Sequence, residues 1–249
     1  MSTVVYANGD SFTAGSELAA DLLPGFPGNT VNPPIAAMTR VKNERWYNRI
    51  HQEHGHLMEH YIKQSTLRAY PQKVGNILDC EVFNNALGGS SMDRIARTTI
   101  SDLIKLKKEH TNIVAVIGTT DIHRIELPNE NKAWASGQPA HNVSIFAPVY
   151  QFYVKYSSSY HALSNYYNNL ISIQDFCKVN NIRLILLDAM SHTDIIKDEE
   201  LTHLVEYVRP YDIDMSKIAQ TTSGEVYAPL GHYTEIVHDR IAEEIVKIL

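Results

Sequence analysis

The alternation of short apolar runs with longer amphipathic segments constrains the fold of this chain more than any other feature. Runs typical of buried strands occupy residues 3–7, 81–84, 112–117 and 182–187. Apolar residues at helical spacing mark segments 92–108 and 234–249, and a tyrosine-rich helical segment leads toward Val179. Strands that alternate with helices in this way predict an α/β fold with a parallel sheet.

Two stretches interrupt this alternation. A long polar segment that is rich in proline and then in histidine separates the first two predicted strands. Connections between a strand and its neighbour are usually short, so we interpret residues from about 17 to 79 as an insertion, a lid or wall of the crevice. The chain is otherwise predicted to be a single domain over residues 1–249. A second stretch, residues 127–148, contains Pro128, Gly137 and Pro139 and is predicted to be a loop.

Composition excludes several classes of function. The formal net charge of -6 argues against electrostatic binding of nucleic acid or of an anionic membrane. Neither a signal peptide nor a run of transmembrane length is apparent, so we expect a cytoplasmic protein, or a virion protein if the source is viral. Cys80 and Cys177 are too few for a disulfide framework and are expected to be buried reduced thiols. No cofactor is predicted, and the oligomeric state is left open.

Ser11 is the best candidate for a reactive atom. It follows Gly9 and Asp10 where the first predicted strand ends. A side chain at the carboxyl end of a strand in an α/β sheet points into the crevice where such folds bind ligands. A hydroxyl there becomes a nucleophile only with a base beside it and with donors for the developing oxyanion.

Three further loci supply residues of the right type. Gly88 and Gly89 follow the second strand, and paired glycines let a backbone N–H approach a ligand closely. The segment from Gly118 to Asp121 follows the third strand, and His232 precedes the last helix. Each locus follows a strand or begins a helix, which predicts that all four converge at one edge of the sheet.

In this order the four loci resemble the blocks of the SGNH hydrolases, the superfamily of GDSL-type esterases and lipases. The resemblance covers nearly the whole chain and looks closest to divergent, phage-encoded members. It implies that Ser11 is the nucleophile, His232 the base, and Gly89 and Thr120 the residues at the oxyanion-hole positions. It also implies a three-layer α/β/α sandwich with a flavodoxin-like central parallel sheet of about five strands.

Two positions depart from the pattern of that family. Thr120 stands where the family has an asparagine, and a threonine hydroxyl is shorter than a carboxamide. Pro229 stands where the family has the aspartate that orients the histidine. A backbone carbonyl or another carboxylate, such as Asp188 or Glu235, could take the place of that aspartate. The sequence alone does not choose among these.

Each candidate also has a structural interpretation. Ser11 could cap the helix that follows it, and His232 could pack or cap at the last helix. His238 is an alternative base. Arg124 could hold a polar or anionic group of the substrate, or form a structural salt bridge with Glu126 or another carboxylate. His51, His54, His56 and His60 lack a recognised ligand pattern, so no metal site is predicted.

Two functional hypotheses follow. In the first, the protein is a serine esterase that hydrolyses a small carboxylic ester, with a sugar O-acetyl ester as one candidate. In the second, the same fold is a weakened or inactive binding or structural protein, for example a component of a viral particle. Fold alone does not distinguish them, because function depends on the site.

Overall fold

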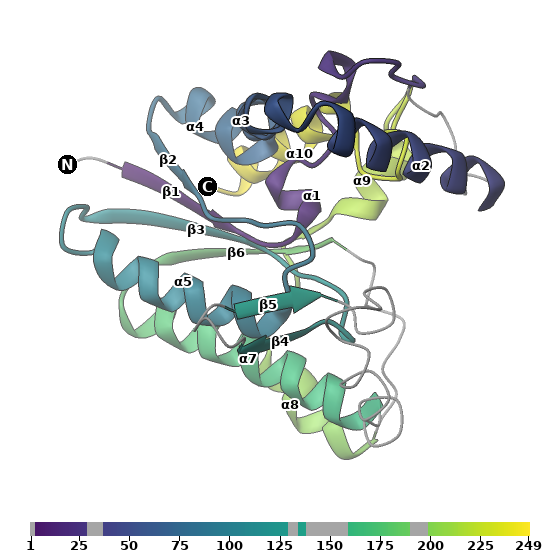
Figure 1. Ribbon diagram of the computed structural model, residues 1–249. Coiled ribbons are helices and arrows are strands. Elements are labelled where there is room, and N and C mark those ends of the chain that lie inside the picture. Colours follow the sequence, from purple (N-terminus) through teal and green to yellow (C-terminus); the bar gives the residue numbers. More distant parts are fainter. Residues whose placement is uncertain (1–2, 29–36, 129–133, 138–158, 190–198) are drawn as a thin grey trace.

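A five-stranded parallel sheet forms the centre of the computed structural model, which describes residues 3–28, 37–128, 134–137, 159–189 and 199–249. Its strands lie in the order β2-β1-β3-β6-β7 (Figure 1). Their bounds are β1 Thr3–Asn8, β2 Glu81–Asn84, β3 Asn112–Gly118, β6 Arg183–Asp188 and β7 Ile213–Asp214. The predicted flavodoxin-like parallel sheet is confirmed, and β7, with only two residues in its span, was not predicted.

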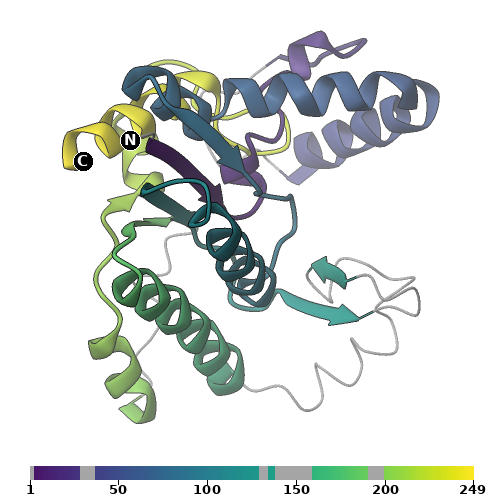
Figure 2. The same ribbon diagram turned by 90° about the vertical axis from the view of Figure 1, so that its left-hand side faces the viewer.

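Helices cover both faces of this sheet, as Figures 1 and 2 show. Side chains of β1 alternate between two cores: Val4 and Tyr6 face one, and Val5 faces the other. The first core is closed by α5 (Met92–Leu106), α7 (Ser159–Val179) and α8 (Thr202–Tyr207). The second is closed by α4 (Tyr70–Leu78), α9 (Met215–Thr221) and α10 (Glu235–Ile248). The chain is therefore a three-layer α/β/α sandwich, as predicted.

The predicted insertion holds most of its helices outside these layers. Between β1 and α4 lie α1 (Ser11–Ala14), η1 (Ala20–Leu22), α2 (Ala37–Glu53), η2 (Gly55–Leu57) and α3 (Met58–Arg68). Trp46 is buried in a separate small core with Met58 and Tyr61, and its indole N–H donates to the Pro24 carbonyl at 2.9 Å. Trp46 thus connects segments within the insertion. A role of the insertion as a lid stays a prediction.

The region predicted as a loop contains a hairpin instead. Strand β4 (Ile125–Pro128) pairs antiparallel with β5 (Trp134–Gly137), and the rest of the stretch up to residue 148 lies outside the described residues. Glu126 fixes the start of this hairpin, because it accepts two hydrogen bonds from the Arg97 guanidinium of α5, at 3.1 and 2.7 Å. Each strand is only four residues long and contains a proline or a glycine, so hydrophobic periodicity did not indicate a hairpin.

The two cysteines are free thiols. Cys177 is buried, and this burial raises the pKa of its thiol to about 12, whereas Cys80 is only half-buried. Among the described helices, none is both long and apolar enough to cross a membrane.

Candidate active site

Ser11 begins a short helix directly after β1. Gly9 makes the turn, and a β-carbon there would lie 2.2 Å from Thr13 Oγ1, so the turn has no room for a side chain. Asp10 is the helix cap, because its carboxylate accepts the Phe12 N–H at 3.0 Å. Capping is therefore the task of Asp10 rather than Ser11, which is the first residue of α1 and is 8% exposed.

A tight turn in the segment before α10 presents His232. The Gly231 N–H donates to the Ala228 carbonyl at 3.0 Å, which makes Pro229 the second residue of the turn, a position where proline is favoured. The imidazole of His232 packs against Phe12, with ring centroids 5.2 Å apart. Since Phe12 follows Ser11 directly, the structure brings His232 to the turn that holds the serine.

A buried carboxylate lies behind the imidazole. Glu17 Oε2 is 2.6 Å from His232 Nδ1. The Glu17 side chain is 2% exposed, and its two oxygens also accept the N–H groups of Leu230, at 2.9 Å, and of His232, at 3.3 Å. The contact with Nδ1 directs the other ring nitrogen, Nε2, away from the carboxylate, which is the arrangement that a general base needs.

Glu17 is the functional candidate that sequence reasoning missed. The carboxylates considered were Asp188, which is buried at the end of β6, and Glu235, whose carboxylate accepts a hydrogen bond from Lys73 at 3.0 Å. Glu17 is separated from His232 by 215 residues in sequence. Its position six residues after Ser11, within a segment that turns back over the nucleophile, was the one available signal.

The backbone of Glu17 is held in a conformation that non-glycine residues rarely adopt. Its φ is 71°, in the left-handed region, which costs on the order of 1–3 kcal/mol. Its N–H donates to the Tyr61 hydroxyl of α3 at 2.9 Å, and the nearby Ala19 N–H donates to Ser65 of the same helix at 3.2 Å. The insertion therefore positions the carboxylate that contacts His232.

Gly88 and Gly89 lie beside the nucleophile. The Leu87 N–H donates to the Gly9 carbonyl at 3.2 Å, which ties the loop after β2 to the turn before Ser11. A β-carbon on Gly88 would lie 3.6 Å from the β-carbon of Ser11. Gly89, with a φ of 77°, follows at once. The loop is close enough to Ser11 for a backbone N–H to serve an oxyanion, and Gly89 stays the predicted donor.

Thr120 and Arg124 meet the carboxylate of Asp10. Arg124 Nη1 donates to Asp10 Oδ2 at 2.7 Å and to Thr120 Oγ1 at 2.6 Å. The Thr120 hydroxyl in turn donates to Asp10 Oδ2 at 3.2 Å. The salt bridge expected for Arg124 is formed with another carboxylate, Asp10, whereas Glu126 pairs with Arg97. A contact of Arg124 with substrate stays a prediction.

His238 lies in the body of the protein. It is 1% exposed, stacks on Tyr70, and accepts the Tyr70 N–H on its Nδ1 at 3.0 Å. Burial, with smaller contributions from the charges of Lys73 and His232, lowers the pKa of His238 to about 3. A ring held neutral and fixed by a backbone N–H is a packing element, so His232 remains the candidate base.

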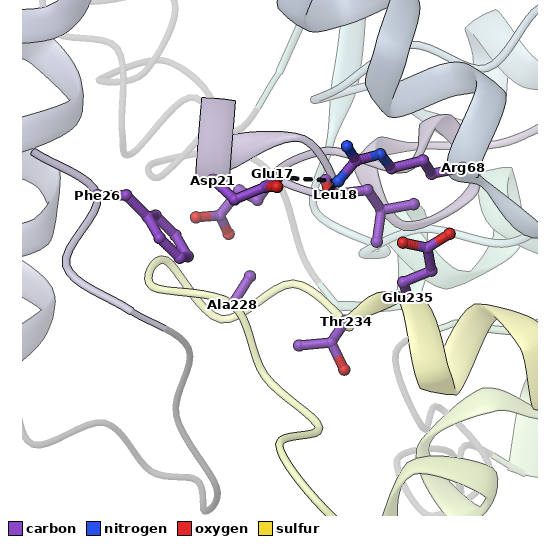
Figure 3. A pocket seen from close by; sticks show the side chains of 8 residues that line it. All are labelled: Glu17, Leu18, Asp21, Phe26, Arg68, Ala228, Thr234 and Glu235. Carbon is purple, nitrogen blue, oxygen red and sulfur yellow. Dashed lines mark hydrogen bonds and ion pairs between the residues drawn. The ribbon is translucent and has the colours of Figure 1, made fainter. Parts of the chain in front are cut away.

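A cavity of about 230 Å³ adjoins Glu17 on the side of the insertion (Figure 3). Glu17, Asp21, Arg68 and Thr234 are among its lining residues, whereas the described residues Ser11 and His232 are not. Arg68 and Asp21 form an ion pair across it, with Nη1 and Oδ1 2.9 Å apart. The cavity therefore lies behind the acid rather than over the nucleophile. The histidines at 51–60 lie in the insertion, and no group of three metal-ligating side chains gathers among the described residues.

Solved structures share this architecture. One is Est2A, an acetyl xylan esterase from the rumen bacterium Butyrivibrio proteoclasticus, with a TM-score of 0.51 and 10% identity over 100% of this chain and 63% of that chain. The chain therefore shares the fold of that esterase, with the three-layer α/β/α sandwich and parallel sheet described above. A protein described as lipolytic and of the G-D-S-L family, from Desulfitobacterium hafniense, has a TM-score of 0.47 and 14% identity, with 99% of each chain covered. No family model and no curated protein matches the sequence.

Proposed function

We propose that the protein is a serine esterase in which Ser11, His232 and Glu17 act as a triad. The observation on which this rests is the 2.6 Å contact between Glu17 and His232 Nδ1, made by a carboxylate that is almost fully buried. A buried carboxylate is costly unless it is paired and hydrogen-bonded, and Glu17 is both. It supplies the group that Pro229 cannot.

The reaction proceeds in two transfers. His232 Nε2 accepts the proton of Ser11 Oγ while Oγ attacks the ester carbonyl, and the carbonyl electrons move onto oxygen to give a tetrahedral oxyanion. The oxyanion collapses, the bond to the leaving alcohol breaks, and His232 returns its proton to that alcohol. Water then attacks the acyl-Ser11 ester with His232 again as base, which releases the carboxylic acid and restores the serine. The N–H groups of Ser11 and Gly89 are the proposed oxyanion donors, with a third donor from the side of the site that holds Thr120 and Arg124.

We propose a small carboxylic ester as substrate, with a sugar O-acetyl ester as the leading candidate. The fold shared with an acetyl xylan esterase supports this class, as does the net charge of -6, which favours a neutral ligand over a polyanion. Arg124 is proposed to face the ester group of the bound substrate.

The test compares hydrolysis of aryl acetates and sugar acetates by the wild type and by Ser11→Ala. We expect the variant to lose all measurable turnover, and Ser172→Ala to keep the wild-type rate. Ser172 is the matched control because it lies in α7, where its hydroxyl donates to the Asn168 carbonyl at 2.8 Å. Equal rates for wild type and Ser11→Ala would reject the esterase and leave the binding or structural protein.

A further inference from the structure

The Thr120 hydroxyl is already engaged in the described structure. A threonine hydroxyl has one proton, and that of Thr120 is donated to Asp10 Oδ2 at 3.2 Å. The same oxygen accepts a hydrogen bond from Arg124 Nη1 at 2.6 Å. To donate to an oxyanion, the hydroxyl would have to leave a buried carboxylate. Thr120, at the asparagine position, is thus better placed to orient Arg124 than to donate a hydrogen bond to the oxyanion.

Arg124 joins the three loops that surround the serine. Its Nη1 lies 2.7 Å from Asp10, which precedes Ser11, 3.5 Å from the carbonyl of Ser90, which follows Gly89, and 2.6 Å from Thr120. The arginine side chain is only 14% exposed, and Asp10 is fully buried. A guanidinium held at this junction is fixed in position before any substrate binds, which is the condition for electrostatic preorganisation.

One edge of the Arg124 guanidinium, Nε and Nη2, makes no hydrogen bond to a described residue. Arginine has five N–H donors, and the contacts to Asp10, Thr120 and Ser90 all use Nη1. Within the described part of the chain, Nε and Nη2 form no hydrogen bond with a protein acceptor. The planar fork therefore has donors available for a negatively charged oxygen beside the loops of Ser11 and Gly89.

We infer that Arg124 supplies the third oxyanion donor, and that Thr120 and Asp10 orient it. This rests on the proposed function, since it concerns the transition state of the same ester hydrolysis. A cationic donor makes up for the missing asparagine because a charge-assisted hydrogen bond is about twice as strong as a neutral one. Arg124 then acts on the reacting oxygen, and Thr120 is a positioning residue.

The kinetic test compares Arg124→Ala with Thr120→Val. We expect Arg124→Ala to lower kcat about 10²- to 10³-fold with little change in KM, which is the range for loss of one oxyanion donor. Millimolar guanidinium should restore part of that rate but none in Ser11→Ala. Thr120→Val, which keeps the guanidinium, should lose less. Arg240→Ala, on the exposed face of α10, is the matched control. A larger loss in Thr120→Val, or a rise in KM alone in Arg124→Ala, would overturn the inference.

A binding measurement separates this inference from the proposed function. Methylphosphonate is a small tetrahedral anion, and its affinity for the Ser11→Ala protein can be measured by titration calorimetry without any turnover. We expect Ser11→Ala to bind it, and Ser11→Ala with Arg124→Ala to bind it at least about 10-fold more weakly, a loss of about 1.4 kcal/mol. Equal affinities would overturn the role of Arg124, even if Ser11 proved to be the nucleophile.

Discussion

The base side and the donor side of this site each lack a residue that the SGNH pattern prescribes, and they replace it in different ways. On the base side, Glu17 provides another carboxylate from a distant part of the chain and contacts the same imidazole nitrogen at 2.6 Å. On the donor side, Arg124 provides a cation in the region of a neutral amide and is fixed by Asp10 and Thr120. Glu17 thus keeps a carboxylate but supplies it from another position in the chain. Arg124 instead supplies a different chemical group, a guanidinium in place of an amide.

This difference indicates what each half of the site demands. An imidazole that becomes charged is stabilised most by an anion at Nδ1, and a neutral acceptor there orients the ring without balancing its charge. An oxyanion accepts any well-placed donor, so an amide, a backbone N–H or a guanidinium can take that task. We therefore expect the base side to tolerate substitution less than the donor side.

Replacement of Glu17 should have the largest effect. Glu17→Gln keeps the size of the side chain and an acceptor for the Leu230 N–H, but it removes the charge that stabilises the imidazolium. We expect kcat to fall about 10⁴-fold, the loss seen when the carboxylate of a serine triad is replaced by its amide.

The matched control for Glu17 is Asp21→Asn. Asp21 lines the same cavity and pairs with Arg68 (Figure 3), but its side chain is half-exposed. This variant should keep the wild-type kcat. Glu17→Asp should recover part of the lost rate, since aspartate tolerates a positive φ and restores the charge. If Asp21→Asn and Glu17→Gln lost activity equally, a structural role would explain both.

The buried His238, which is the histidine within α10, should affect the stability of the fold toward acid. In the unfolded chain His238 titrates near 6.5, but in the folded protein its pKa is lowered to about 3. As the pH falls from 6.5 toward 3, His238 binds a proton in the unfolded state but not in the folded state. The free energy of unfolding therefore decreases over that range. Urea unfolding at pH 7 and pH 4 should show a loss that is larger, by on the order of a few kcal/mol, in the wild type than in His238→Asn. Parallel losses would contradict this account of the ring.

On the donor side, the anchor of the hairpin should matter moderately. Arg124 immediately precedes β4, whose Glu126 is held by the bidentate pair with Arg97. Glu126→Gln removes one acceptor of that pair and should let Arg124 shift. We expect kcat to fall by less than in Arg124→Ala, at most about 10²-fold. Glu243→Gln on the exposed face of α10 is the control, and an unchanged kcat in Glu126→Gln would show that the hairpin does not position Arg124.

The smallest expected effect is the coupling between the two sides. If they are independent, the activation free energies lost in Glu17→Gln and Arg124→Ala should add in the double variant to within about 0.5 kcal/mol. Glu17→Gln should be far from additive with His232→Ala, because those two residues act as one unit. Strong coupling between Glu17 and Arg124 would show that the base side and the donor side act as one unit in catalysis.

The fold was largely predictable because it depends on patterns that are local. Residues 113–117 and 184–187 are apolar, and both lie in buried strands of the sheet. The hairpin at Ile125–Gly137 was missed because its strands are only four residues long and contain proline or glycine, and because the pair of Arg97 with Glu126 that holds its start joins distant residues. Hydrophobic periodicity cannot report such a contact.

The candidate site was predictable only in part, for a related reason. Ser11 was named because it follows the first strand, and Gly89, Thr120 and His232 because their loci, in this order, resemble the SGNH blocks. Glu17 was not, because its place depends on a left-handed backbone and on Tyr61 from a helix of the insertion. No local pattern encodes that combination. The insertion, predicted as a lid, also supports the acid.

The rate at which an organophosphonate labels Ser11 tests the central claim most directly, because labelling needs both a nucleophile and a working base. Mass spectrometry of the wild type should show one adduct on the peptide that contains Ser11. Glu17→Gln should be labelled at least about 10²-fold more slowly at neutral pH, and Asp21→Asn at the wild-type rate. No adduct on Ser11 in the wild type, or equal rates in the wild type and Glu17→Gln, would contradict a triad completed by Glu17.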